Sequence, residues 1–489
     1  MSTRRLRPDA RMAARLGVIF LALLTTARPG VAFGQNEAAK PGEVTKAPKP
    51  EPIDWKKTTD EAAKFLSQYI QINTTNPPGN EIKAAQILKD KFLTDGIPAT
   101  IWQSAPGRGI VAARLRGVGR KRKAIILLSH MDVVPANPKE WSVPPFSGTI
   151  RDGSVWGRGA LDDKGPGVIE MMAMLAIKRA GILLNRDVLF VATGDEETGG
   201  KQGAEWFANN EKDIYSDTHY LLNEGGAIMV RPNGSEIYAV SVTEKTPLWL
   251  RLTATGPAGH AADPAAETSV THLIRALARL IDYRPKIHVL RPVANYFRVL
   301  AEVDRGPRQW FDLASSLHDP LFAREFVAVP YQNALVRDTL APTVLAASPK
   351  INEVPQTAYA DVDCRLLPGE KPKAFLETVR KVIADKSIKI QVLLTSPAIS
   401  SPQRSPLMRA IEELAHKNKS RAVPTMISGF TDSRFFRHHG VISYGFIPIE
   451  LSAADESGIH GINERVGVNQ LGDAIRRMVT LLEIFGGRK

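Results

Sequence analysis

The stretch "VLFVATGDEETGG" (Val188 to Gly200) joins an apolar run directly to three consecutive carboxylates, Asp195, Glu196 and Glu197. Its first part, Val188–Val191, is typical of a buried strand. Adjacent like charges repel, so the end of a strand seldom gathers them without a counter-charge. In open α/β sheets, ligands bind beyond the carboxyl ends of the strands. The stretch therefore predicts an α/β fold with a charged site at the end of this strand.

Three more segments place carboxylates or an imidazole at the expected sheet edge. They are "SHMD" after Ile125–Leu128, the glycine-rich loop "WGRGALDDKG" (Trp156 to Gly165), and "NE" after Tyr220–Leu222. Taken singly, each has a simpler interpretation, such as a local hydrogen bond or a helix-capping turn. Together they would repel one another unless cations lay among them, so we expect a divalent metal ion or a pair of ions. Mixed imidazole and carboxylate ligands suit zinc, with cobalt and manganese as alternatives.

The rest of the chain shows two kinds of pattern. Up to about Thr243, helical stretches alternate with short apolar strands, and Thr59-Asp60 is expected to cap the first helix. From there the pattern indicates a smaller α+β domain inserted into the first. It begins with an alternating strand (Leu248 to Gly256) and an amphipathic helix (Thr271 to Tyr283), and a further strand, helix and strand follow. The pattern leaves residues 291–343 unassigned. The predicted boundaries are 1–34 for a signal peptide, 35–54 for a disordered tether, 55–244 and 397–489 for the first domain, and 245–396 for the inserted domain.

Composition and the N-terminus limit the classes of function. The 489 residues carry a formal charge of +13, but the basic residues are scattered and no nucleic-acid-binding module accompanies them, so we expect no nucleic-acid partner. The single cysteine, Cys364, excludes an internal disulfide. Arginines precede the apolar run Leu16–Ala27 and small residues follow it, as in a secretory signal. We expect an exported protein, periplasmic or extracellular, with an uncleaved anchor as the alternative.

Four motifs resemble those of the metallopeptidase-20 family, which includes aminoacylases, glutamate carboxypeptidases, acetylornithine deacetylases and succinyl-diaminopimelate desuccinylases. The motifs are "SHMDVVP", "WGRGALDDKG", "GDEETGG" and "HGINE". The resemblance runs from about Trp55 to the C-terminus, and "LLNEGG" and "INTTNPPGNE" are most similar to the secreted carboxypeptidase and aminoacylase branch. It implies an α/β fold: a zinc-peptidase-type catalytic domain with a central mixed, mostly parallel sheet, interrupted by an α+β lid or dimerisation domain.

The resemblance also implies two zinc ions per subunit and their ligands. His130, Asp162 and Glu224 would bind one ion, and Asp162, Glu197 and His460 the other, so Asp162 would bridge them. The peptide bond from Asp162 to Asp163 is expected to be cis. Among the catalytic residues, Glu196 would act as the general base, and Asp132 would fix the tautomer of His130 through its far ring nitrogen. Asp195 has no such role, and we expect it to cap or support its loop.

In the inserted domain, the resemblance implies residues that approach the substrate. His260, in "GPAGHAADP", would reach across a homodimer to stabilise the tetrahedral intermediate, and Asn352 in "INEVP" would assist it. Arg365 and Arg434 match positions that grip the free carboxylate of the substrate, to which the arginine fork is suited. Two alanines follow His260 where relatives commonly have serines.

These features predict a secreted dinuclear-metal amidohydrolase. Its substrates would be N-acyl amino acids or the C-terminal residues of short peptides, small molecules with a free carboxylate. One alternative within the family is a dipeptidase, which needs an acid or carbonyl to hold a free amine. Alternatives from other classes are a catalytically inactive metal-binding and dimerising module, and a zinc carrier. A zinc carrier has no use for Glu196, a carboxylate that is not a ligand.

Overall fold

The computed structural model describes residues 50–119 and 123–487, all within the compact unit Ala47–Lys489. The predicted signal peptide and most of the predicted tether lie outside these residues. Where the tether meets the first helix, the backbone N–H of Glu51 donates to Ala180, and Asp54 caps the helix by accepting from the N–H of Lys57. The predicted disorder therefore does not extend to Asp54, and the expected cap at Thr59-Asp60 is wrong, because helix α1 begins earlier, at Trp55. No helix in the described ranges is long and apolar enough to cross a membrane.

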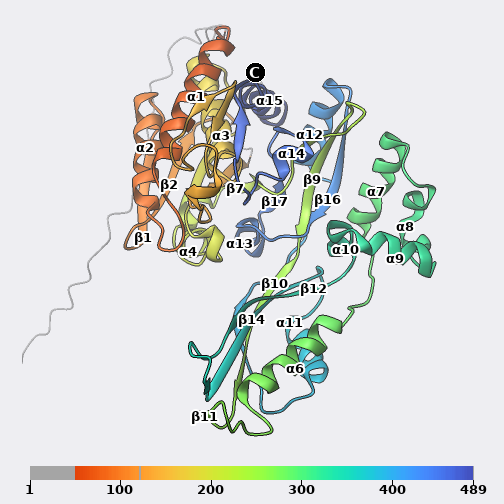
Figure 1. Ribbon diagram of the computed structural model, residues 1–489. Helices are drawn as coiled ribbons and strands as arrows, with labels where there is room; N and C mark the ends of the chain where they lie inside the picture. Colours follow the sequence, from red (N-terminus) through yellow and green to blue (C-terminus); the bar gives the residue numbers. More distant parts are fainter. Residues whose placement is uncertain (1–49, 120–122, 488–489) are drawn as a thin grey trace, which may run out of the picture. The chain divides into compact units, whose positions relative to one another are not determined.

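The larger sheet has ten strands, in the order β1-β2-β6-β3-β7-β17-β9-β8-β18, with β16 paired to β9 (Figure 1). Its centre is parallel, because β3 pairs in parallel with β6 and β7, and β17 with β7. The outer pairs β1–β2, β2–β6 and β8–β9 are antiparallel. The bounds are β1 Ala99–Ala105, β2 Arg108–Leu115, β3 Ala124–His130, β6 Val188–Thr193, β7 Thr218–Asn223, β8 Ile228–Val230, β9 Glu236–Glu244, β16 Arg421–Ile427, β17 Ile442–Gly445 and β18 Glu450–Leu451. The predicted mixed, mostly parallel sheet is thus confirmed.

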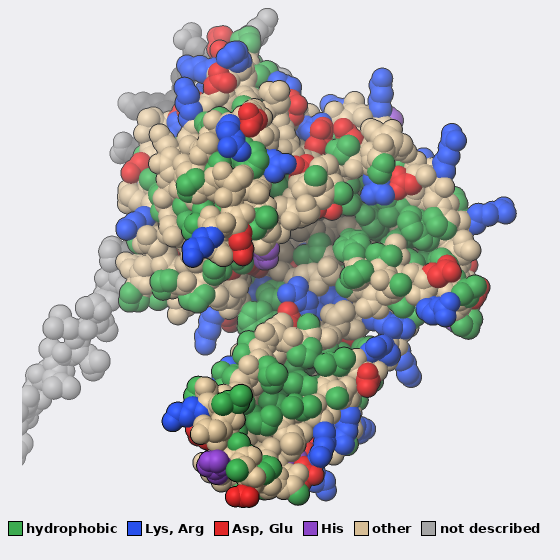
Figure 2. Space-filling view, in the orientation of Figure 1, with side chains coloured by type: hydrophobic (Ala, Val, Ile, Leu, Met, Phe, Trp, Pro, Cys, Tyr) green, Lys and Arg blue, Asp and Glu red, His purple; other side chains and the backbone are tan. Residues whose placement is uncertain are grey.

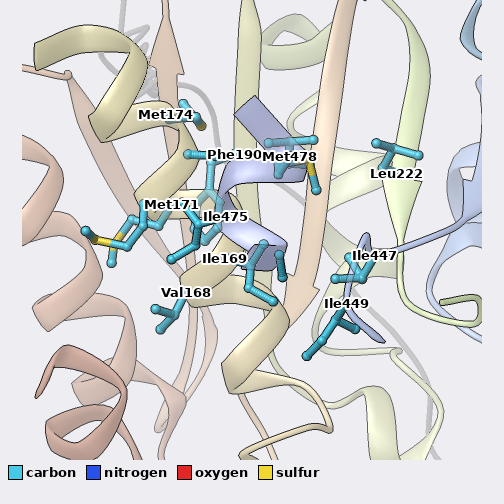
Figure 3. Close-up of a cluster of buried hydrophobic side chains, with 14 of the residues drawn as sticks. Val168, Ile169, Met171, Met174, Phe190, Leu222, Ile447, Ile449, Ile475 and Met478 are labelled. Atoms are coloured by element: carbon cyan, nitrogen blue, oxygen red, sulfur yellow. The ribbon is translucent and has the colours of Figure 1, made fainter. Parts of the chain in front are cut away.

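Helices cover this sheet and bury its apolar strands. Helix α3 is buried along almost its whole length, and packs between the sheet and helices α1 and α15. Figure 3 shows part of this core, where Met171 and Met174 of α3 lie near Phe190 of β6 and Met478 of α15. Unbranched methionines fill irregular gaps between such elements. The helices with these roles are α1 Trp55–Gln71, α2 Glu81–Thr94, α3 Lys164–Arg179, α4 Ala204–Asn210, α5 Lys212–Tyr215, α12 Pro406–Lys417, α13 Ser433–His438, α14 Ala453–Glu456 and α15 Val468–Gly486.

A second, four-stranded sheet has the antiparallel order β12-β14-β10-β15. Strand β10 alternates as predicted, with Leu248, Leu250 and Leu252 buried on one face. That face packs against two amphipathic helices, and the N-cap Thr268 begins the first of them with a capping box. The bounds are β10 Thr246–Thr255, β12 Thr339–Ala346, β14 Thr357–Leu366, β15 Lys389–Thr395, α6 Ser269–Asp282 and α11 Pro372–Ile383. A small pair, β11 Gly259–His260 and β13 Glu353–Val354, is separate, as is the sheet of β4 Ile150–Arg151, β5 Ser154–Trp156 and β19 Arg465–Gly467.

The segment that the sequence pattern left unassigned is helical up to Val336 and then continues into β12. Tyr296 and Phe297 share a buried cluster with Ile237 of β9 and Met426 of β16, so this segment covers the larger sheet (Figure 1). The bounds are α7 Arg291–Asp304, η3 Arg308–Asp312, α8 Leu313–Ser316, α9 Pro320–Ala328 and α10 Pro330–Val336. The chain therefore returns to the larger sheet in the middle of the predicted inserted domain, whose limits of 245–396 stay a prediction.

Candidate active site

Strand ends and the loops that follow them bring the predicted metal ligands together. His130 is the last residue of β3, Asp162 precedes α3, Glu197 follows β6 and Glu224 follows β7. Because β6, β3 and β7 are parallel neighbours, their carboxyl ends lie at one edge of the sheet. His460 arrives from the loop after α14 with a positive φ of 58°. The residues of the "GDEETGG" stretch thus lie where the sequence predicts them.

The distances between side-chain atoms agree with the two predicted sets of three ligands, which share Asp162. His130 Nε2 lies 2.9 Å from Asp162 Oδ1 and 3.9 Å from Glu224 Oε1. His460 Nε2 lies 3.0 Å from Asp162 Oδ2 and 3.3 Å from Glu197 Oε2. Each oxygen of Asp162 therefore faces a different imidazole. The peptide bond between Asp162 and Asp163 is cis, as the resemblance implied.

The carboxyl groups of this cluster are crowded, buried or half-buried, and incompletely hydrogen-bonded within the described residues. Burial raises the pKa of Glu196 and of Glu224 well above the usual glutamate value, and nearby carboxylates raise it further. Hydrogen bonds to Asp162 and Glu197 raise the pKa of His460 to about 10. Oε1 of Glu197 is buried and has no hydrogen-bond partner in the described chain. Crowded, incompletely paired carboxylates facing imidazoles are a donor set that fits divalent metal ions.

The cluster also contains groupings that could hold a single ion. Ligand atoms of His130, Asp162 and Glu197 lie within 4.8 Å of one another, and so do those of His130, Glu196 and Glu224. The predicted metal site beside His130 is therefore supported by the geometry. The number of ions stays a prediction.

Asp132 supports both His130 and the acidic loop. Nδ1 of His130 lies 3.0 Å from the backbone oxygen of Asp132 and 3.5 Å from its Oδ1, so the nearer partner is the backbone and not the expected carboxylate. The Asp132 carboxylate instead accepts the backbone N–H groups of Glu196 and Glu197, both at 3.1 Å. One residue thus fixes the imidazole and the two glutamates relative to each other.

Asp195 holds the acidic loop from behind. Its carboxylate accepts hydrogen bonds from the Thr198 hydroxyl at 2.6 Å and from the backbone N–H of Gln202 at 2.8 Å. It does not cap the short helix that follows, so loop support is its role. Asn76 donates to Asp132 at 2.8 Å and accepts from Arg108, which also lies 3.4 Å from Asp195.

Two groups that position the site were not identified as such from the sequence. One is Asn76 with Arg108, although the loop "NTTNPPGNE" that contains Asn76 was among the resemblances. The other is Glu464, at the end of "HGINE", which is fully buried. Its carboxylate accepts from the backbone N–H groups of Leu161 and Asp162 at 2.7 and 3.0 Å, and from Arg158 at 2.7 Å. It ties the loop of Asp162 to the loop of His460, and its place in the "HGINE" motif was the available signal.

The structure brings His260 and Asn352 together, but at exposed positions. His260 lies on β11, and Nδ1 of its ring accepts from the backbone N–H of Ala262 at 3.0 Å. The backbone oxygen of Asn352 accepts from the next residue after His260, Ala261, at 3.2 Å. Among the described residues, neither side chain contacts the cluster of metal ligands. Their catalytic roles stay predictions.

Arg365 and Arg434 lie against the same aromatic ring. Their guanidinium carbons are 5.4 and 4.8 Å from the centroid of Phe430. Arg365 is half-exposed and pairs with Asp363 at 2.9 Å. Arg434 is 1% exposed, and donates to the backbone oxygens of Thr431 and Gly199 at 2.6 and 2.9 Å. In this conformation Arg365 is open to a ligand, whereas Arg434 binds the protein backbone.

The fold and the site together define a hydrolase with a metal-binding cluster at the edge of an α/β sheet. The model of Peptidase family M20/M25/M40 matches residues 126–484, and the chain belongs to this family. The predicted family, fold class and metal-dependent hydrolysis of amide and peptide bonds are confirmed at this level.

Individual relatives cover most of the chain. N-fatty-acyl-amino acid synthase/hydrolase PM20D1 of Homo sapiens is 29% identical over 389 residues, which are 76% of this chain and 75% of that protein. Probable carboxypeptidase S-like 2 of Dictyostelium discoideum is 29% identical over 366 residues, 72% and 70% of the two chains. A solved M20 family metallo-carboxypeptidase, Sso-CP2 from Sulfolobus solfataricus, has a TM-score of 0.69 at 20% identity and covers 87% of this chain and 99% of its own. The structural likeness concerns the fold.

Proposed function

We propose that this chain is an exported amidohydrolase that holds two divalent metal ions and cleaves N-acyl amino acids or the C-terminal residues of short peptides. One observation carries the proposal. The cluster pairs two imidazoles with Asp162, Glu197 and Glu224, and leaves Glu196 buried beside them without an ion pair to either histidine in the described chain. The names of the relatives, an N-fatty-acyl-amino acid synthase/hydrolase and a carboxypeptidase S-like protein, support the substrate class.

In this proposal each side chain has one task. Asp162 would be a ligand shared by two ions, zinc or alternatively cobalt or manganese. His130 and Glu224 would complete the ligands of one ion, and His460 and Glu197 those of the other. When bound, the ions would lower the pKa of a water molecule and polarise the scissile carbonyl. Glu196 takes the proton from the attacking water and passes it to the leaving nitrogen. Burial raises the pKa of Glu196 above the usual glutamate value.

The inserted domain would complete the site. Arg365, half-exposed over Phe430 and paired with Asp363 at 2.9 Å, is the cation that would exchange this partner for the free carboxylate of the substrate. His260 and Asn352 would act on the oxyanion from a second copy of the chain, so a homodimer forms through the inserted domain. Exposed Leu345 on the edge strand β12 supports such a contact, because an unpaired strand edge is a ready site for association.

The test is the Glu196→Gln variant of the signal-free protein, loaded with zinc. We expect metal content to equal that of the wild type, while kcat on N-acetyl, long-chain N-acyl or dipeptide substrates falls by roughly 10²–10⁴. Glu197→Gln should instead lose metal. Glu205→Gln, a half-buried glutamate on α4 nearby, is the matched control and should keep both metal and turnover.

Two outcomes would overturn the proposal. Turnover retained in Glu196→Gln removes that residue as the base. If the zinc-loaded wild type hydrolyses none of the three substrate classes, the amidohydrolase function is wrong. The alternative of a catalytically inactive metal-binding module then remains.

A further inference from the structure

A cavity of about 770 Å³ opens beside the metal-ligand cluster. His460 lines it, and so does Gly225, the residue after Glu224. Much of its wall is apolar and comes from the segment that the sequence pattern left unassigned. This acyl-side wall consists of Tyr296, Phe297 and Leu300 of α7, Trp310 of η3, Met229 of β8 and Met426 of β16. Its volume is that of a pocket for a small molecule.

The acyl-side wall is fixed by packing. Tyr296 and Phe297 are each 2% exposed and Met426 is fully buried, because the far sides of these residues belong to the cluster between α7 and strands β9 and β16. The surface is hollowed here, and Figure 2 shows hydrophobic side chains gathered over these elements. Val329 and Tyr331 also line the cavity and are 44% and 47% exposed, so an apolar entrance leads to the wall. Such a preformed apolar cavity can bind a ligand with little reorganisation.

The polar groups of the cavity are few. Arg231 is neutralised by Asp304, whose Oδ1 lies 3.1 Å from its Nε. The other polar side chains that line the cavity include Gln332, Thr425, Ser428 and Glu456, and burial raises the pKa of Glu456. At another edge the cavity reaches Gly429, next to Phe430 and hence to Arg365. A substrate carboxylate therefore has a cation outside the apolar wall.

We propose that this cavity binds the hydrocarbon chain of the acyl group of an N-acyl amino acid, and that helices α7 and α10 set the chain length the enzyme accepts. The inference rests on the proposed amidohydrolase function, which it narrows from small acyl groups or peptides to long apolar acyl groups. With the amide at the metal cluster, the acyl chain enters past His460 and lies along the acyl-side wall. The amino-acid carboxylate points toward Arg365.

The experiment measures kcat/KM of the zinc-loaded protein on one amino acid carrying straight acyl chains from acetyl to palmitoyl. Each buried methylene should raise kcat/KM by roughly fourfold until the cavity is filled, after which it levels off. Gln332→Trp, on α10, puts a large side chain into the cavity at a half-buried position. It should lower kcat/KM on long chains at least roughly tenfold more than on the N-acetyl substrate.

The matched control is the next residue on the same helix. Asn333 is also half-buried but lines a different cavity, so Asn333→Trp should keep the wild-type chain-length profile. Glu456→Gln tests the competing occupant, an amine. A dipeptide whose free amine binds Glu456 loses kcat/KM in this variant, whereas acyl substrates do not.

The outcomes separate the two proposals. Hydrolysis of N-acetyl substrates with a flat chain-length profile, or equal effects of Gln332→Trp and Asn333→Trp, overturns the acyl cavity and leaves the amidohydrolase standing. A large loss on dipeptides in Glu456→Gln, with dipeptides the better substrates, also overturns it in favour of a dipeptidase. Absence of hydrolysis of every N-acyl substrate, with dipeptides still cleaved, overturns the acyl cavity alone. Absence of dipeptide hydrolysis as well overturns the proposed function itself.

Discussion

The edge of the larger sheet and the β11–β13 tip of the second sheet contain catalytic-type residues in very different surroundings. At the sheet edge, His130 is 2% exposed and contacts carboxylates or backbone through both ring nitrogens. At the tip, His260 is exposed and Asn352 beside it is exposed as well. One chain thus brings the predicted metal ligands together from strand ends and loops. The residues of the tip face solvent, so the catalytic role predicted for His260 would require a second surface to meet the tip.

The largest expected effect on metal content and activity comes from a substitution among the predicted ligands at the sheet edge. Asp162→Asn removes the charge that faces both imidazoles, so we expect loss of metal and a fall in kcat/KM of at least roughly a thousandfold, beyond the 10–100-fold typical of a residue outside the ligand set. Metal analysis and kinetics on an N-acyl amino acid measure both. Asp152→Asn, in an exposed turn, is the control and should match the wild type. Full metal content and activity in Asp162→Asn would show that the sheet edge is not the metal site.

The next effect tests the tip. His260→Ala should lower kcat by roughly 10²–10³, as expected for loss of one oxyanion donor, without changing metal content. If His260 acts on the other subunit, mixing His260→Ala with Glu196→Gln creates one intact site in each mixed dimer. Random mixing should then restore about a quarter of wild-type activity. Full activity of His260→Ala alone would assign the tip no catalytic role, and a catalytic defect without restoration would place His260 in the site of its own chain.

The smallest expected effect concerns an ion pair between helices α1 and α3 that has no predicted role in catalysis. Glu61 accepts from Arg179 at 2.7 and 2.8 Å, and the Arg179 guanidinium lowers the pKa of Glu61 to about 2. A lowered folded-state pKa stabilises the protein above the unfolded value near 4.5, and this stability is lost as the pH falls toward 2. Because the two side chains are 35% and 27% exposed, solvent screens the pair, and Arg179→Ala should cost about 1 kcal/mol or less at pH 7.

Thermal unfolding between pH 7 and pH 2 measures this effect. The difference in Tm between wild type and Arg179→Ala should shrink as the pH falls below 4.5, with kcat/KM unchanged at neutral pH. Lys56→Ala, which removes the exposed pair with Asp60, is the control and should show a smaller difference. A constant difference across the pH range would mean that Arg179 contributes by packing and not through Glu61.

The strand ends were predictable because their chemistry is local. Apolar runs predict strands, parallel strands share an edge, and carboxylates after such runs must meet there, which placed His130, Glu197 and Glu224 correctly. Contacts between distant segments were not predictable. The amphipathic pattern of α7 shows that one face is buried but not that β9 and β16 bury it. Similarly, nothing local to Arg434 shows that its guanidinium binds the backbone of Gly199.

The position of β17 in the larger sheet has a consequence for the order in which the molecule is built. This strand, Ile442–Gly445, lies between β7 and β9, although ribosomal synthesis reaches it after almost all other strands of that sheet. His460, the second imidazole of the cluster, emerges later still. So does Glu464, which accepts a hydrogen bond from the loop of Asp162. A nascent chain that stops before Ile442 therefore has a sheet divided into two parts and an unfinished ligand set. The set of predicted ligands is accordingly complete only after synthesis has passed His460 and Glu464.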